Sequence, residues 1–121
     1  MSMANYIKSA DWKAEKHVPA ITVGGRFVPG QPIEVEISVG KDIPHPNTVE
    51  HHIMWVALYY VADGSPLPIE LGRADFSAHG AMATAPVAKF SVTLDKPGKF
   101  LAVAYCNLHG LWEGEAVFAA D

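Results

Sequence analysis

Residues 32–39, which read PIEVEISV, alternate apolar and polar side chains from one position to the next. The apolar residues fall at every second position: Ile33, Val35, Ile37 and Val39. In an extended chain these side chains share one face, and the side chains between them share the other. A period of two therefore predicts a β-strand with one face buried in a core.

Six further stretches have the composition of strands and are separated by turn sequences such as ADGSP and DKPGK. Residues 51–62, HHIMWVALYYVA, are apolar on both faces, which predicts a central strand. The other candidates are 20–28, 69–76, 87–94, 99–106 and 113–120. Seven short strands without a helical repeat predict an all-β fold, an antiparallel two-sheet sandwich. Residues 1–16 lack such a pattern, so we expect a short N-terminal arm or helix there.

The composition narrows the class of protein. With 121 residues, half of them hydrophobic and a net charge of -4, the chain is expected to be one folded domain, 1–121. The acidic balance argues against nucleic acid as a partner. No segment has the ~20 apolar residues that span a membrane, and the N-terminus lacks a signal-peptide pattern. The single cysteine excludes an internal disulfide, so we expect a soluble protein of the reducing cytoplasm.

Histidine and the only cysteine recur in three separate stretches: EKHVP at 15–19, PHPNTVEHHI at 44–53 and CNLHG at 106–110. The prolines beside His45 restrict that loop, and a C-x-x-H turn lets Cys106 and His109 converge. A thiolate with several imidazoles suits iron, copper or zinc and not magnesium or calcium. These stretches therefore predict a metal site. His52 is expected to point to the opposite face of its strand from His51, and His79 to be exposed in a loop.

The three motifs, in this order along the chain, resemble those of the superoxide reductases, and more narrowly of the one-iron neelaredoxin class. The resemblance implies an immunoglobulin-like β-sandwich with one mononuclear non-haem iron. The implied ligands are four equatorial histidines and one axial thiolate: His17, His45, His51, His109 and Cys106. It also implies that Glu15 binds iron in the ferric state only and that Lys16 lies near the open face. Larger relatives hold a second iron in an N-terminal domain with four cysteines. This sequence has one cysteine, Cys106, and lacks those four.

The activity implied by the resemblance is one-electron reduction of superoxide to hydrogen peroxide, with rubredoxin or a similar small donor reducing the iron again. It further implies a homo-oligomer, a dimer or a tetramer. Superoxide is an anion and the chain is acidic, so a local cation is needed to attract it. Lys16 is the main candidate for that cation, and Lys41 is a weaker one.

The residues alone leave other functions open. The strongest alternative is a blue-copper electron carrier, which also combines a β-sandwich, an upstream histidine and a late cysteine–histidine loop. Such sites commonly have a methionine shortly after the second histidine, and HGLWEGE has none. A structural zinc site usually has more cysteines. A cysteine–histidine hydrolase would need a separate base and an oxyanion motif, and neither stands out.

Overall fold

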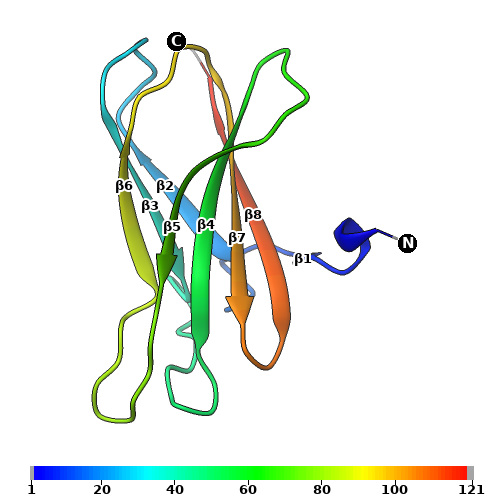
Figure 1. The fold of residues 1–121 in the computed structure, drawn as a ribbon, viewed down its shortest axis with the longest axis vertical. Coiled ribbons are helices and arrows are strands. Elements are labelled where there is room, and N and C mark those ends of the chain that lie inside the picture. Colours follow the sequence, from blue (N-terminus) through cyan, green and yellow to red (C-terminus); the bar gives the residue numbers. More distant parts are fainter. Residues whose placement is uncertain (1, 120–121) are drawn as a thin grey trace.

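The computed structural model describes residues 2–119, which form two β-sheets packed face to face (Figure 1). One sheet has the strand order β1-β8-β7-β4-β5, and the other has the order β2-β3-β6. The strands are β1 (Lys8–Ser9), β2 (Pro19–Gly24), β3 (Ile33–Val39), β4 (Ile53–Ala62), β5 (Ile69–Asp75), β6 (Val87–Val92), β7 (Gly98–Cys106) and β8 (Gly110–Phe118). All neighbours are antiparallel except β1 and β8. The predicted antiparallel sandwich is confirmed, with one strand more than the seven expected.

The additional strand lies in the N-terminal arm. A single 3-10 turn, Met3–Asn5, precedes β1, and Figure 1 shows this segment projecting away from the sandwich. The pair of residues in β1 is too short to carry a period, which is why sequence patterns did not reveal it. None of the helical segments among residues 2–119 is long and apolar enough to cross a membrane.

The strand boundaries differ from the prediction mainly at turns. The stretch 20–28 was expected to be one strand, but β2 ends at Gly24. Gly25 has a φ of 113°, a backbone conformation that glycine adopts readily and other residues avoid, so the chain leaves the sheet there. In the other direction, β8 begins at Gly110 and not at 113, because it pairs with β7 from the end of their hairpin.

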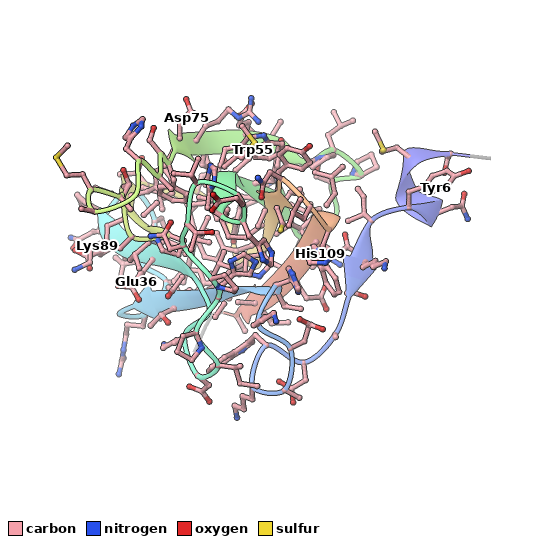
Figure 2. All side chains as sticks on the ribbon, turned by 90° about the horizontal axis from the view of Figure 1, so that it is seen from below. Tyr6, Glu36, Trp55, Asp75, Lys89 and His109 are labelled. Carbon is pink, nitrogen blue, oxygen red and sulfur yellow. The ribbon has the colours of Figure 1, made fainter. Side chains whose placement is uncertain are left out.

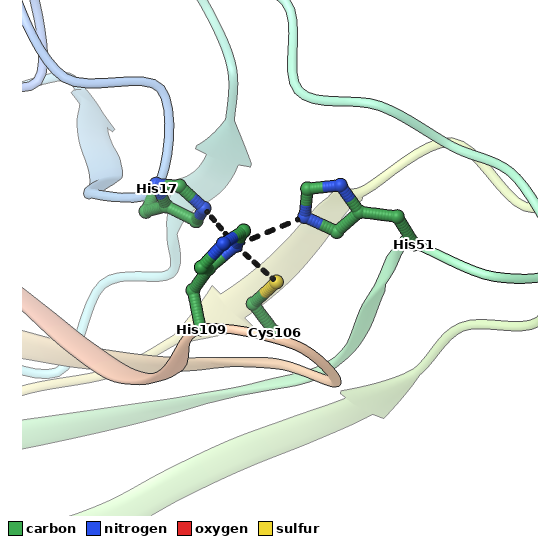
Figure 3. A group of neighbouring side chains, drawn as sticks. All are labelled: His17, His51, Cys106 and His109. Carbon is green, nitrogen blue, oxygen red and sulfur yellow. Dashed lines mark hydrogen bonds between the residues drawn. The ribbon is translucent and has the colours of Figure 1, made fainter.

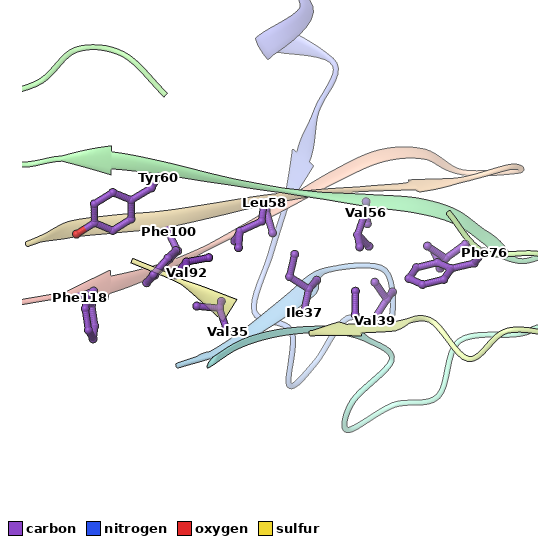
Figure 4. Packing of buried hydrophobic residues seen from close by; sticks show 14 of the residues in the cluster. Val35, Ile37, Val39, Val56, Leu58, Tyr60, Phe76, Val92, Phe100 and Phe118 are labelled. Carbon is purple, nitrogen blue, oxygen red and sulfur yellow. The ribbon is translucent and has the colours of Figure 1, made fainter. Parts of the chain in front are cut away.

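The core lies between the two sheets (Figure 4). Val35, Ile37 and Val39 of β3 are at most 3% exposed, which confirms the face predicted from their alternation. In β4, the consecutive residues 56–58 are fully buried, as expected for a central strand covered on both faces. Each fully buried aliphatic or aromatic side chain of this kind stabilises the fold by about 1.5–3 kcal/mol relative to exposure.

The sandwich brings three distant parts of the chain to one end. Ile53, at the start of β4, pairs with Cys106 at the end of β7. Cys106 also pairs with Gly110, so residues 107–109 form the tight turn between β7 and β8. His17 comes just before β2, in the segment that joins the arm to the second sheet. All three cysteine- and histidine-containing motifs are thereby positioned for one site.

Candidate metal centre

One ligand atom from each of four side chains lies within 4.8 Å of the others (Figure 3): His17, His51, Cys106 and His109. His109 is in the middle, with its Nδ1 3.2 Å from the Nε2 atoms of both His17 and His51. The same Nδ1 lies 3.8 Å from Sγ of Cys106. Imidazole nitrogens and a thiol sulfur directed at a common point form a donor set for a cation such as iron, copper or zinc.

Glu15 sets the orientation of His17. Oε1 of Glu15 lies 2.7 Å from Nδ1 of His17 and also accepts a hydrogen bond from the His17 backbone N–H at 3.1 Å. The ring proton is therefore assigned to Nδ1, which leaves Nε2 unprotonated and directed at the cluster. The hydrogen bond from His17 is the main reason that the pKa of Glu15 lies below its usual value. In this structure Glu15 contacts a predicted ligand and is not itself among the four clustered groups.

His51 is held by a tight turn. Its backbone N–H donates to Oγ1 of Thr48 at 3.0 Å, and the Thr48 N–H donates to the His51 carbonyl at 2.9 Å. Burial, followed by the charges of His109 and His17, lowers the pKa of the His51 side chain. A lowered pKa favours the neutral imidazole, which is the form that binds metals.

His45 is buried beside the cluster, with 8% of its surface exposed. Its ring centroid is 4.8 Å from that of His17 and 4.6 Å from that of His51. Nδ1 donates to the Pro46 carbonyl at 2.6 Å, and burial is the main cause that lowers the pKa of His45 to about 4. The loop also approaches Gly40 closely, because a Cβ there would lie 2.5 Å from the His45 backbone nitrogen.

The other ring nitrogen of His45, Nε2, indicates that these residues can bind a metal. Among residues 2–119, His45 Nε2 is the buried side-chain nitrogen or oxygen that has no hydrogen-bond partner. Leaving such an atom unsatisfied costs about 1–3 kcal/mol, so native structures seldom contain one without a reason. A cation bound beside His17 and His51 would supply the missing partner. The four clustered groups therefore fit a metal ion, with the unpartnered nitrogen of His45 beside them.

Two residues that the sequence reasoning did not single out hold this end of the molecule together. Asn107 Oδ1 accepts a hydrogen bond from the His52 N–H, and its Nδ2 donates to the Glu50 carbonyl, both at 3.0 Å. These bonds tie the Cys106–His109 turn to the segment around His51. Trp112 packs against His17. Both lie within or just after the C-x-x-H turn, and that proximity is the sequence signal that could have found them.

The remaining predicted residues occupy varied positions. Lys16 is half buried, and its positive charge adds to the effect of burial in lowering the pKa of both His45 and His51. Lys41 is exposed and donates to Thr22 Oγ1 at 2.8 Å. His52 lies outside the cluster, with Nδ1 donating to the Thr48 carbonyl at 2.9 Å, and His79 is exposed. Of the two lysines that the sequence singled out, Lys16 is the one whose charge lowers the pKa of neighbouring histidines.

The desulfoferrodoxin family model matches residues 9–115 of this chain. The chain is 50% identical to the superoxide reductase of Pyrococcus horikoshii, over 90% of this chain and 92% of that protein. It is 38% identical to the neelaredoxin of Megalodesulfovibrio gigas, over 98% of both. The solved structure of the Archaeoglobus fulgidus superoxide reductase (neelaredoxin) in its reduced form superimposes with a TM-score of 0.85 at 48% identity, covering 94% of this chain and 98% of that one.

These similarities run through all three cysteine- and histidine-containing motifs, since the family match spans EKHVP, the 44–53 loop and the CNLHG turn. They also extend to the backbone, because the sandwich that positions the motifs is shared with a solved relative. Sequence, fold and clustered side chains agree, and this chain belongs to the desulfoferrodoxin family.

Proposed function

We propose that this chain is a superoxide reductase with one mononuclear non-haem iron. The proposed ligands are the four clustered side chains together with the buried imidazole: His17, His51, Cys106, His109 and His45. The observation that carries the proposal is the convergence of three histidine nitrogens on the only cysteine, within 4.8 Å. Iron in this donor set supplies a one-electron couple and an acceptor for an anionic substrate. A blue-copper site is less well supported. It uses two histidines, so it would leave His45 and either His17 or His51 without a role.

The residues around the cluster suit a small anionic substrate. Reduction of superoxide to hydrogen peroxide consumes one electron and two protons, so both the anion and water must reach the site. His109 is exposed, which gives solvent access to one side of the cluster. Lys16 is the nearby cation whose charge acts on His45 and His51, and we assign it the role of attracting superoxide.

Glu15 is proposed to bind the iron in the ferric state only. The hydrogen bond with His17 lowers the pKa of Glu15 and so favours the carboxylate, the form that binds metals. To act as a ligand it must give up its contact with His17 Nδ1, which is 2.7 Å long in this structure. The contact and the proposed ligation are therefore alternatives, and Glu15 would leave His17 to bind iron in the ferric state.

The donor, assembly and location follow from the same proposal. A rubredoxin or a similar small one-electron carrier is the proposed reductant, as for the family that the sequence resembles. A dimer or tetramer is supported by β8, where Val117 is 76% exposed and β1 pairs only with Trp112 and Glu113. The proposed compartment is the cytoplasm, where reducing conditions keep the only cysteine available as a ligand.

The substitution Cys106→Ser tests this proposal. With iron bound and oxidised, the wild type should show a visible thiolate-to-iron charge-transfer band, and C106S should lose it with most of the superoxide reduction. Leu108→Ala, at an exposed position of the same turn, is the control that keeps the thiol. A C106S protein with an unchanged visible spectrum would overturn the assignment.

A further inference from the structure

Trp112 contacts two of the clustered histidines, which lie 92 residues apart in the chain. Its ring stacks on that of His17 with a centroid separation of 4.8 Å and an interplanar angle of 14°. Its Nε1–H donates to the His109 carbonyl at 3.2 Å. The indole is only 9% exposed, and Lys8 of β1 lies over the same ring at 5.5 Å. One side chain thus holds the ring of one histidine and the backbone of the other.

These contacts restrict the two histidines in different ways. Glu15 fixes one edge of the His17 ring but leaves the ring free to tilt about that hydrogen bond. The flat face of Trp112 opposes this tilt. The bond to the His109 carbonyl holds the turn in which His109 lies, and β8 supports Trp112 through its pairing with Ala104 of β7. Ligands fixed before the metal binds lose little freedom on binding it.

We propose that Trp112 is a positioning residue for the metal site, which orients His17 by stacking and anchors the turn of His109 through its indole N–H. This inference rests on the proposed iron site and adds a residue that contacts no proposed substrate. Trp112 is also a buried aromatic residue, and packing alone would give it a stabilising role. If Trp112 only packs, its loss should lower the stability of the fold and leave iron release unchanged. If it positions the ligands, its loss should also speed the release of iron.

Trp55 offers a matched control. It belongs to β4 of the same sheet, packs on Tyr105 at 5.9 Å and lies beneath Arg73 at 4.7 Å. Figure 2 shows Trp55 and His109 in separate parts of the metal end, and Trp55 makes none of the ring or hydrogen-bond contacts to the four clustered residues that Trp112 makes. Replacing either tryptophan removes one indole from the sheet. Only one of the two removals takes away a contact to the cluster.

The experiment compares the wild type with Trp112→Leu, Trp112→Phe and Trp55→Leu. The first measurement is the NMR spectrum of the metal-free protein, in which stacking shifts the His17 ring protons upfield. The second is the rate at which ferrous iron passes to a chelator, with thermal unfolding of the metal-free proteins measured alongside. W112L should lose the upfield shift and release iron about 10–100-fold faster, the usual effect of removing a residue that orients a ligand. W112F retains a stacking ring but lacks the indole N–H. It should release iron only about fivefold faster than the wild type, the effect of losing one hydrogen bond.

W55L should lower the unfolding temperature and leave iron release unchanged. Iron release from W112L at the wild-type rate would overturn the inference while leaving the iron site itself in place. If W112L does not fold, W112F provides the test. Iron release more than about tenfold faster than in the wild type, although a ring is still present, would contradict a role for stacking. A wild type that retains no iron would instead contradict the proposed function.

Discussion

Between the two sheets, apolar side chains of neighbouring strands pack on one another, whereas at the metal end four side chains converge from three segments far apart in the sequence. The core residues Val35 and Ile37 are satisfied by apolar contacts that the strands themselves provide. The metal end instead gathers imidazoles in a small space and leaves His45 Nε2 without a partner. The core therefore stabilises the fold by itself, while the metal end is expected to be stabilised fully only with a cation present.

The largest effect should come from the core. Phe100 is fully buried and packs on Tyr60 and Phe118, with centroids 4.8 and 5.7 Å away. Phe100→Ala should lower the free energy of unfolding by about 3–5 kcal/mol, as other buried phenylalanines do, with no change in the iron spectrum. Urea unfolding and absorption spectra measure the two effects. Phe90→Ala, at a half-buried position, is the control with a smaller loss. A spectral change without a loss of stability would contradict the division between core and metal end.

The next effect is the pH dependence of the metal-free protein. Burial lowers the pKa of His45 from about 6.5 to about 4, so the folded chain stays unprotonated while the unfolded chain takes up a proton. Between pH 6.5 and 4 the unfolded state thus binds more protons, and stability falls as the pH falls. The loss attributable to His45 is at most about 3 kcal/mol. Urea unfolding along a pH series measures it.

In His45→Asn the same pH series should be shallower. It should not become flat, because the pKa of His51 is lowered as well and contributes in the same direction. Bound iron should leave the dependence at least as steep, since the metal-bound imidazoles of the folded state take up no proton whereas those of the unfolded chain still do. A variant whose dependence matches that of the wild type would mean that His45 is not the group responsible.

Glu15 gives a smaller effect that separates its two proposed roles. Glu15→Ala removes both the carboxylate and the acceptor for His17 Nδ1–H, whereas Glu15→Gln keeps an acceptor. Both variants should shift the ferric absorption band and keep the fast reaction of the ferrous form. Only Glu15→Ala should release iron faster, by about tenfold. Complete loss of iron in both variants would make Glu15 an obligatory ligand and contradict a role confined to the ferric state.

The smallest effect concerns Lys16, and it depends on salt. Charges at a surface are screened over about 10 Å at 0.1 M ionic strength, so attraction of superoxide should be greatest at low salt. Lys16→Glu should slow the second-order reaction of the ferrous protein more than Lys16→Ala does, and should flatten or reverse its salt dependence. The resting spectrum should hardly change. Pulse-generated superoxide measures the rates, with Lys41→Ala as the control. If the second-order rate constant depends on ionic strength equally in all variants, Lys16 does not attract superoxide.

The core was predictable because its signal is local. The alternation around Val35 and the apolar run through Leu58 indicate which faces are buried, whatever the strands pair with. Strand ends were less predictable, because a single conformation such as the positive φ of Gly25 decides where a strand stops. The arm strand β1 forms only because β8 offers an edge to Lys8 and Ser9, a contact that no local pattern encodes.

The metal end was predictable in its residue types and not in its geometry. Motif resemblance pointed to five ligands; the fold brings His17, His51, Cys106 and His109 together and places the fifth, His45, beside them. The stacking of Trp112 on His17 joins positions far apart in sequence, so it could be found only once β8 and the segment before β2 were placed. The buried, unpartnered nitrogen of His45 likewise depends on the packing of its whole loop.

Reduction of superoxide at this site has a stoichiometry that can be measured. The iron-loaded, reduced protein is mixed with less than one equivalent of superoxide, and hydrogen peroxide and oxidised iron are measured together. A reductase yields one peroxide and one oxidised iron for each superoxide consumed, because the electron comes from the protein. Because the ferrous iron of a dismutase reacts in the same way, the oxidised protein is also mixed with superoxide, which a dismutase would oxidise to oxygen while its iron returned to the ferrous state. We expect the first yield, with iron that stays ferric in the second mixture; oxygen release together with reduction of the ferric iron would contradict a reductase.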